Sequence, residues 1–570
     1  MNDRQLTNAA AAKRLVIEAA TGRRPADLVF KNATFVNVFS QEMETADIAI
    51  TQGAICGIGS YEGAEEVDMT GKILLPGFVD AHMHLESTLL TPNEFVKAAL
   101  PHGTTTVVAD PHEIANVLGV DGIRYMLQAT QDLPVDVRFM IASCVPATPQ
   151  DESGAVLTWW DIAPFYRERR VLGLGEMMDF YGVCNADEDI LRKLVLTLDS
   201  RHCVDGHCPD LTGKDLNAYI AAGISTDHEC YSLDEALEKL RRGMYILIRE
   251  GTAAHNLAAL MPLLKSRYAD RCMFCTDDKH PNDILERGHI DYIVKTAIAE
   301  GVSPGVAIKA ASLNPARHFR IARQGAIAPG YNADFVVIDN FENFNIKLVY
   351  KEGKLVYDGK VANVPEPGID PILVKKVHDT FHVRPISEDS FKNDKPLPVI
   401  GLVGGEIISS NEGYAETISV EDDLLKVASI ERHKLTGHIG LGFIKGYGLK
   451  KGAVATSIAH DSHNIIVVGT NEADMALAVN HVIGMNGGIA IVSDGELKGG
   501  VALEIAGLMT KRPILEVNNE LEAAKNAAYD LGVSHEIDPF MTLSFMSLTV
   551  IPTLRITTKG IFDVESQSYI

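Results

Sequence analysis

The chain has 570 residues, of which 46% are hydrophobic and 22% are charged, so we expect a globular protein with more than one domain. Its formal net charge of −24 argues against nucleic-acid and anionic-membrane partners, because both are themselves negatively charged. No apolar run approaches the roughly 20 residues of a membrane span, and no signal-peptide core is visible. These features predict a cytoplasmic protein.

The cysteines support the same expectation. All eight lie between Cys56 and Cys275, whereas a secreted disulfide framework would be denser and spread through the chain. Cys272 and Cys275 form a CxxC pair, but the apolar residues between them indicate a strand and not a zinc knuckle. We therefore expect reduced thiols.

The predicted elements begin with an amphipathic helix over residues 1–24. Residues 25–73 then alternate apolar and polar positions between glycine-rich turns, which is typical of antiparallel strands. A matching set of strands is predicted at residues 325–365. We expect the two sets to pair as a small β-sandwich that is split in the sequence by the segment between them.

Residues 74–324 alternate short apolar runs with helical patterns, as a parallel sheet requires. Polar residues follow these runs at their carboxyl ends. This pattern is typical of a (β/α)8 barrel enzyme, which places its active site at the carboxyl ends of the strands. The eight predicted strands are 74–84, 105–110, 137–143, 171–176, 203–207, 223–228, 245–250 and 273–277.

Prolines and charged residues cluster in residues 366–398, which predicts a linker. Residues 399–570 follow, a length typical of one further domain. They include a strand–helix–strand pattern between residues 464 and 492, which indicates an α+β domain. The predicted fold class is therefore α/β, with a (β/α)8 barrel inserted in a small β-sandwich and followed by a C-terminal α+β domain.

Six residues near the predicted strand ends form a candidate metal centre. His82 and His84 are two residues apart on a strand, so their imidazoles project to one side. The others follow separate strands whose ends meet at one barrel mouth. Four imidazoles and two carboxylates can ligate two divalent ions, and a ligand set without thiolates suits Mn, Fe or Zn. The full set is His82, His84, Glu176, His207, His228 and Asp277.

Further polar residues near the strand ends allow two interpretations. Glu86 could contact a substrate or orient His84. Arg249, with Glu250, could contact a substrate or form an internal ion pair. Loop structure alone would account for Asp278. The residues after the second strand, which could line the pocket or support the ligands, are Asp110, His112 and Glu113.

The C-terminal region has a polar cluster of its own, His460, Asp461 and His463, directly before a predicted strand. These side chains could bind a metal ion or reach into the barrel mouth. A capped turn is the simpler interpretation, and we prefer it.

Several segments resemble known families. Residues 76–87, PGFVDAHMHLES, resemble the opening strand of the amidohydrolase superfamily, and residues 325–338, GAIAPGYNADFVVI, resemble its return to the β-sandwich. Residues 108–119, 205–211 and 275–281 are similar to bacterial adenine deaminases. The likeness extends through nearly the whole chain.

The resemblance implies roles for the ligands. His82, His84 and Asp277 would hold the more buried ion, His207 and His228 the outer ion, and Glu176 would bridge them. Many relatives place a carboxylated lysine on the fourth strand, but residues 171–176 contain no lysine, which speaks against a hydantoinase or dihydroorotase. The resemblance favours manganese or iron over zinc.

The resemblance also implies a reaction, the hydrolytic deamination of adenine in purine salvage or adenine catabolism. A hydroxide would attack C6, and Asp277 would pass its proton to the departing ammonia. Glu86 would donate a hydrogen bond or a proton to a purine ring nitrogen or accept one from it, a role that requires a protonated carboxyl or a raised pKa. Further substrate contacts are expected from His112, Arg249 and Asp278.

Two alternatives remain open at this point. The first is another nucleobase or a cyclic amide as substrate, and the second is a barrel without catalytic function that serves as a scaffold. The base rate for soluble enzymes favours a homodimer.

Overall fold

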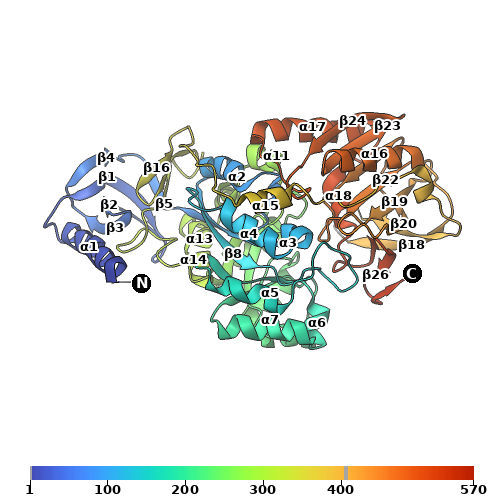
Figure 1. Ribbon diagram of the computed structural model, residues 1–570. Coiled ribbons are helices and arrows are strands. Elements are labelled where there is room, and N and C mark those ends of the chain that lie inside the picture. The colour runs from blue at the N-terminus through green and yellow to red at the C-terminus, as the bar shows by residue number, and fades with distance from the viewer. Residues whose placement is uncertain (1–2, 404–407) are drawn as a thin grey trace.

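The computed structural model describes residues 3–403 and 408–570. Residues 1–2 of the predicted N-terminal helix and 404–407 of the predicted C-terminal region lie outside the described residues. Figure 1 shows three parts side by side: a sheet formed near the N-terminus, a central set of strands and helices, and a second sheet built by the C-terminal region.

The first part is one sheet with helix α1 (Asp3–Ala20) packed against it. Its described strands are β1 (Ala26–Asn37), β2 (Glu42–Thr51), β3 (Ala54–Gly59), β4 (Gly63–Asp68), β5 (Ile73–Pro76), β14 (Phe335–Ile338), β15 (Ile346–Lys351) and β16 (Lys354–Tyr357). Strand β14 pairs with β5, so the expected pairing of the two strand sets is confirmed. The described strands are nevertheless hydrogen-bonded as one sheet and not as two separate layers, because the long strand β1 pairs with β2, β4 and β5.

The central part contains parallel strands in two curved sheets. In the part of the chain that is described, these strands are β6 (Phe78–Met83), β7 (Thr104–Ala109), β8 (Asp136–Ile141), β9 (Val171–Met177), β10 (Cys203–Gly206), β11 (Thr226–Asp227), β12 (Tyr245–Arg249) and β13 (Cys272–Cys275). One sheet has the order β10-β9-β8-β7-β6 and the other β11-β12-β13. Hydrogen bonds join them at both seams, from Ser225 N–H to Val204 O (3.1 Å) and from Asp277 N–H to His82 O (3.0 Å).

The first predicted strand, 74–84, is in fact two strands. Its first half is β5 of the N-terminal sheet, and its second half is β6 of the parallel sheet. Gly77 lies between them at a close approach, since a Cβ there would be 2.3 Å from Thr105 Oγ1. The chain therefore changes sheets at a residue without a side chain.

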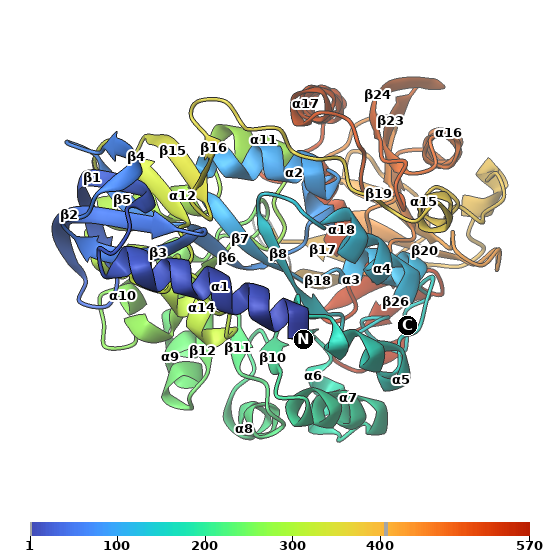
Figure 2. The same ribbon diagram turned by 60° about the vertical axis from the view of Figure 1, so that its left-hand side comes forward.

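Helices connect the parallel strands and cover them from outside. Figure 2 shows α7 (Glu188–Asp199), α8 (Gly213–Ala221) and α9 (Leu233–Arg241) on the outer side of β10–β12. Helix α7 begins where Asp187 accepts hydrogen bonds from Asp189 N–H and Ile190 N–H, and it buries Ile190 and Leu194. The other described helices of this part are α2 (Pro92–Ala99), α3 (His112–Leu118), α4 (Val120–Ala129), α5 (Trp159–Ile162), α6 (Phe180–Cys184), α10 (Leu257–Leu264), α11 (Pro281–Glu286), α12 (Ile290–Ala299), α13 (Pro304–Ala310) and α14 (Leu313–His318).

The C-terminal part follows helix α15 (Pro371–Val377). Its larger sheet has the order β18 (Ser409–Ala415), β17 (Leu397–Leu402), β20 (Ile439–Lys445), β19 (Leu424–Ile430), β22 (Ile465–Gly469), β21 (Ala453–Thr456), β23 (Gly488–Ser493) and β24 (Glu496–Ala502). The strand–helix–strand pattern expected at residues 464–492 is present as β22, α16 (Glu472–Gly484) and β23, with β21 paired between the two strands. The remaining described α-helices and strands are α17 (Ile514–Asp530), α18 (Pro539–Phe545), β25 (Leu554–Thr557), β26 (Gly560–Asp563) and β27 (Ser568–Tyr569).

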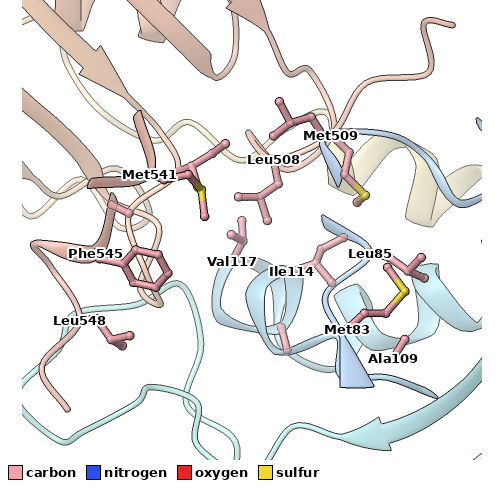
Figure 3. Packing of buried hydrophobic residues seen from close by; sticks show 14 of the residues in the cluster. Met83, Leu85, Ala109, Ile114, Val117, Leu508, Met509, Met541, Phe545 and Leu548 are labelled. Carbon is pink, nitrogen blue, oxygen red and sulfur yellow. The ribbon is translucent and has the colours of Figure 1, made fainter. Parts of the chain in front are cut away.

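The C-terminal part packs on the carboxyl ends of the central strands. Figure 3 shows Leu508 of the C-terminal part beside Val117 and Ile114 of α3, and Met509 on the side of Leu85, the second residue after β6; all belong to one buried cluster that also includes Met83 and Ala109 at the ends of β6 and β7. The backbones also meet, because Thr510 N–H donates to Leu89 O (2.9 Å) and Thr91 N–H donates to Thr510 O (3.0 Å). The face where the predicted ligands lie is therefore covered by the C-terminal part.

The eight cysteines of the sequence are unpaired, and Cys272 and Cys275 are buried in β13. In the described ranges, we find no helix with both the length and the apolar character needed to cross a membrane.

Candidate metal centre

The structure brings the six predicted ligands together at the carboxyl ends of the parallel strands. His82 lies in β6 and Glu176 in β9, whereas the other four follow β6, β10, β11 and β13 within two residues. All six side chains are buried. Parallel strands end on the same face, which explains how residues far apart in the sequence converge.

His82, His84 and Asp277 form the inner group. The Nε2 atoms of the two histidines are 3.3 Å apart, and they lie 3.6 Å and 3.0 Å from Asp277 Oδ1. Their Nδ1 atoms face Asp205 Oδ2 (3.2 Å) and Asp110 O (2.9 Å), both of which are acceptors. Each Nδ1 therefore carries the proton, and the Nε2 lone pairs of both rings point into one space, as in histidines that ligate a metal.

His207 and His228 form the outer group with Glu176. His207 Nδ1 and His228 Nε2 are 3.3 Å apart, and they lie 2.8 Å and 3.2 Å from Glu176 Oε2. The other oxygen, Glu176 Oε1, faces His82 and His84 at 3.6 Å and 3.2 Å. One carboxylate oxygen faces each group, so the donor set fits a divalent metal centre.

Arg249 forms an internal ion pair, which was one of its two interpretations. Its guanidinium contacts both oxygens of Glu229, with Nη2 2.7 Å from Oε2, and its Nη1 lies 2.6 Å from Asp277 Oδ2. Burial disfavours the charged carboxylate of Asp277, but the Arg249 charge keeps its pKa well below the usual range. Glu229 was missed, and its position directly after His228 was the only available signal.

Glu86 lies in the 3-10 turn Glu86–Thr88, where its Oε1 accepts from Ile114 N–H (3.2 Å). Burial, together with the neighbouring carboxylate of Glu113, raises the pKa of Glu86 to about 8. Its Oε2 is buried, and no described residue hydrogen-bonds to it. Because His84 is held by Asp110, the expected alternative that Glu86 orients His84 receives no support.

Ser87 connects two further acidic residues. Its Oγ lies 2.6 Å from Glu113 Oε1 and 2.5 Å from Asp278 Oδ1, although one hydroxyl can donate to only one of them at a time. Asp278 thus has a partner beyond its own loop. The explanation of Asp278 by loop structure alone is therefore incomplete.

The cluster of the C-terminal part reaches the cavity that the candidate ligands line, so a turn that only caps a strand was the wrong interpretation. His112 lies between the two parts, with Nδ1 3.4 Å from Glu176 Oε1 and Nε2 3.6 Å from Asp461 Oδ1. His463 Nε2 lies 3.5 Å from Glu113 Oε2. The sequence signal was present, but which strand ends it would face depends on how the parts pack.

Glu113, His460 and His463 also lie close enough to share a cation. However, His463 Nδ1 accepts a hydrogen bond from Ala459 N–H (3.4 Å), so a neutral His463 carries its proton on Nε2, the atom that faces Glu113. A protonated nitrogen cannot ligate a metal. We interpret this contact as a link that positions Glu113.

One cavity opens onto the predicted ligands. Five of the six line it, together with His112, Arg249 and Asp278, whereas Glu86 is not among its described lining residues. The C-terminal part adds His460, Asp461, Phe545, Leu548 and Ile551. The site is therefore built by both parts of the chain.

Residues 73–356 match the amidohydrolase family, and residues 406–568 match the adenine deaminase C-terminal domain. With the converging histidines and carboxylates, the first match places the chain in a class of hydrolases that use a divalent metal. The second match narrows the class: the chain belongs to the adenine deaminase family. It is 44% identical to adenine deaminase 2 of Carboxydothermus hydrogenoformans, and 45% identical to the adenine deaminases of Nitratidesulfovibrio vulgaris and Kosmotoga olearia. Each alignment covers 97% of this chain and 98% of the relative.

Proposed function

We infer that the protein catalyses the hydrolytic deamination of adenine to hypoxanthine and ammonia. The observation that carries this conclusion is similarity to curated adenine deaminases over 97% of the chain, which includes the C-terminal part that closes the site. The convergence of all six candidate ligands supports a catalytic protein and not a scaffold, because a scaffold has no need of them.

In this reaction the C6–N bond of adenine breaks and a C6–O bond to a water oxygen forms. We propose that His82, His84 and Asp277 hold one divalent ion, that His207 and His228 hold a second, and that Glu176 bridges them. Bound there, the ions would lower the pKa of a water molecule and so supply a nucleophile near neutral pH.

We propose that Asp277 moves the proton. Its carboxylate accepts a proton from the attacking water and delivers it to the amino group, which leaves as ammonia. Arg249, 2.6 Å from Asp277 Oδ2, favours the ionised carboxylate, so the proton is held briefly and is released readily. This contact suits Asp277 to a transfer in both directions.

We propose that Glu86 serves a ring nitrogen of the base, because its buried Oε2 has no other partner among the described residues. Glu86→Gln keeps the shape but cannot transfer a proton, so we expect kcat to fall about 100-fold with the metal content unchanged. Steady-state kinetics with metal analysis would check this. A variant with the full kcat would assign Glu86 a structural role.

The experiment that tests the function measures hypoxanthine and ammonia from adenine, with protein that was loaded with manganese and with the same protein after chelation. We expect turnover in the loaded protein alone. Metal-loaded protein that binds its ions yet leaves adenine unchanged would contradict adenine deamination. It would point to another nucleobase or a cyclic amide.

We propose manganese or iron as the ions, which metal analysis of the purified chain would test. We also propose that β6 to β13 form a closed (β/α)8 barrel, that residues 399–570 are a separate domain after the linker 366–398, and that two chains form a dimer. Limited proteolysis and sedimentation would test the domain division and the dimer.

A further inference from the structure

The cavity has one wall that comes from the C-terminal part of the chain. Phe545, Leu548 and Ile551 make this wall apolar, and His460 and Asp461 are the polar side chains that the described C-terminal residues add. Asp461 of this wall is separated from the candidate ligand Glu176 by the His112 ring. A substrate that reacts at those ligands would therefore meet the C-terminal part with its far end.

The loop that carries Asp461 is held firmly in place. His460 N–H donates to Ser544 O (3.1 Å), and Ser547 Oγ donates to His460 O (2.9 Å). The His460 ring is stacked on Phe545, with centroids 4.8 Å apart. These contacts tie the loop to helix α18 and the residues after it, so the Asp461 carboxylate has a defined position.

Asp461 has one oxygen without a partner. Oδ1 lies 3.6 Å from His112 Nε2 and 3.7 Å from His460 Nδ1, whereas Oδ2 is buried and has no hydrogen-bond partner among the described residues. A buried carboxylate oxygen without a donor is unfavourable in the free protein. This oxygen is therefore ready to accept a hydrogen bond from a ligand.

The position of Asp461 matches the far side of a purine. His112 lies between Glu176 and Asp461, so the Asp461 carboxylate is separated from the candidate ligand Glu176 by one imidazole ring and by contacts of 3.4 Å and 3.6 Å on its two sides. A base whose C6 reacts beside Glu176 and Asp277 would direct its five-membered ring away from them. In the free base, that ring carries one N–H donor.

We propose that Asp461 determines specificity for the free base by accepting a hydrogen bond from the imidazole N–H of adenine through Oδ2. This assignment rests on the proposed deamination of adenine. A purine substituted at N9, such as a nucleoside, has no imidazole N–H, so it would leave the buried carboxylate unpaired. Sites built around such a donor reject analogues that lack it by about 10⁴-fold.

The test compares kcat/KM for adenine and 9-methyladenine in the wild type, Asp461→Ala and Asp461→Asn, with metal content measured for each. We expect the wild type to prefer adenine by about 10⁴-fold. Asp461→Ala should lose about 10- to 100-fold with adenine, as for a hydrogen bond to a charged group, and should gain activity with 9-methyladenine, because the carboxylate that this substrate leaves unpaired is gone. The isosteric Asp461→Asn keeps the volume of the side chain, and its preference for adenine should lie between that of the wild type and that of Asp461→Ala.

Asp494→Ala serves as the matched control, because its side chain is 74% exposed in the same part of the chain and should leave both rates unchanged. If Asp461 acts only by positioning His112, its variants should lose activity equally with adenine and with 9-methyladenine. An unchanged ratio of the two kcat/KM values would therefore overturn the assignment of Asp461 but leave the proposed deamination of adenine intact. A wild type that does not deaminate adenine would overturn the proposed function and this assignment together.

Discussion

Replacement of Asp277 by asparagine should lower kcat for adenine by about 10²- to 10⁴-fold, the range for a lost general base. The amide cannot accept the proton of the attacking water, and it also brings no negative charge to the inner ligand group. Arg249 would keep its pair with Glu229, so we expect the fold to persist. The measurement is steady-state ammonia release, with metal analysis of the same sample.

The control for this prediction is Asp270→Asn. Asp270 is an aspartate of the central part whose side chain is 66% exposed and pairs with Lys309, and neither residue is among those that line the cavity. Its substitution should leave kcat unchanged. Full turnover by Asp277→Asn with its metal bound would show that another group moves the proton.

Glu176→Gln should have its largest effect on metal binding. Each oxygen of Glu176 faces a different pair of histidines, and an amide supplies only one good acceptor and no charge. Loss of a residue that only supports a ligand costs about 10- to 100-fold in metal affinity, so loss of the bridge itself should cost more than about 100-fold. Competition with a chelator, followed by metal analysis, measures this directly.

Glu188→Gln is the matched control, because the Glu188 side chain is 73% exposed at the start of α7. It should retain both its metal and its activity. A Glu176→Gln protein that keeps the wild-type metal affinity would mean that the two histidine pairs hold their ions without a shared carboxylate.

The sequence was most informative where the chemistry is local. His82 and His84 were identifiable because two residues on one strand share a face, and Glu176 because it ends a clear apolar run. The boundary between β5 and β6 was not identifiable, since one continuous apolar run passes through both sheets. Periodicity reports which residues are apolar, and it does not report which sheet they join.

The acidic residues that hold the ligands and Arg249 in place could not be identified from the sequence. Asp205 holds His82, and Glu229 holds Arg249, through contacts between different strand ends. Carboxylates of this kind are common next to strand ends, and neither residue has a spacing that distinguishes it from a solvated acid. Only the register of neighbouring parallel strands decides which acid meets which partner.

By itself, the sequence determined the kinds of ligand, their places at strand ends and the likeness to a deaminase family, because these depend on residue type and short-range order. The tertiary structure alone decided that Glu176 offers one oxygen to each histidine pair and that Asp461 faces His112. Those contacts join segments far apart in the chain. The Glu176 contacts exist because parallel strands end on one face. The contact of Asp461 with His112 exists because apolar packing brings residues 508–548 of the C-terminal part over that face.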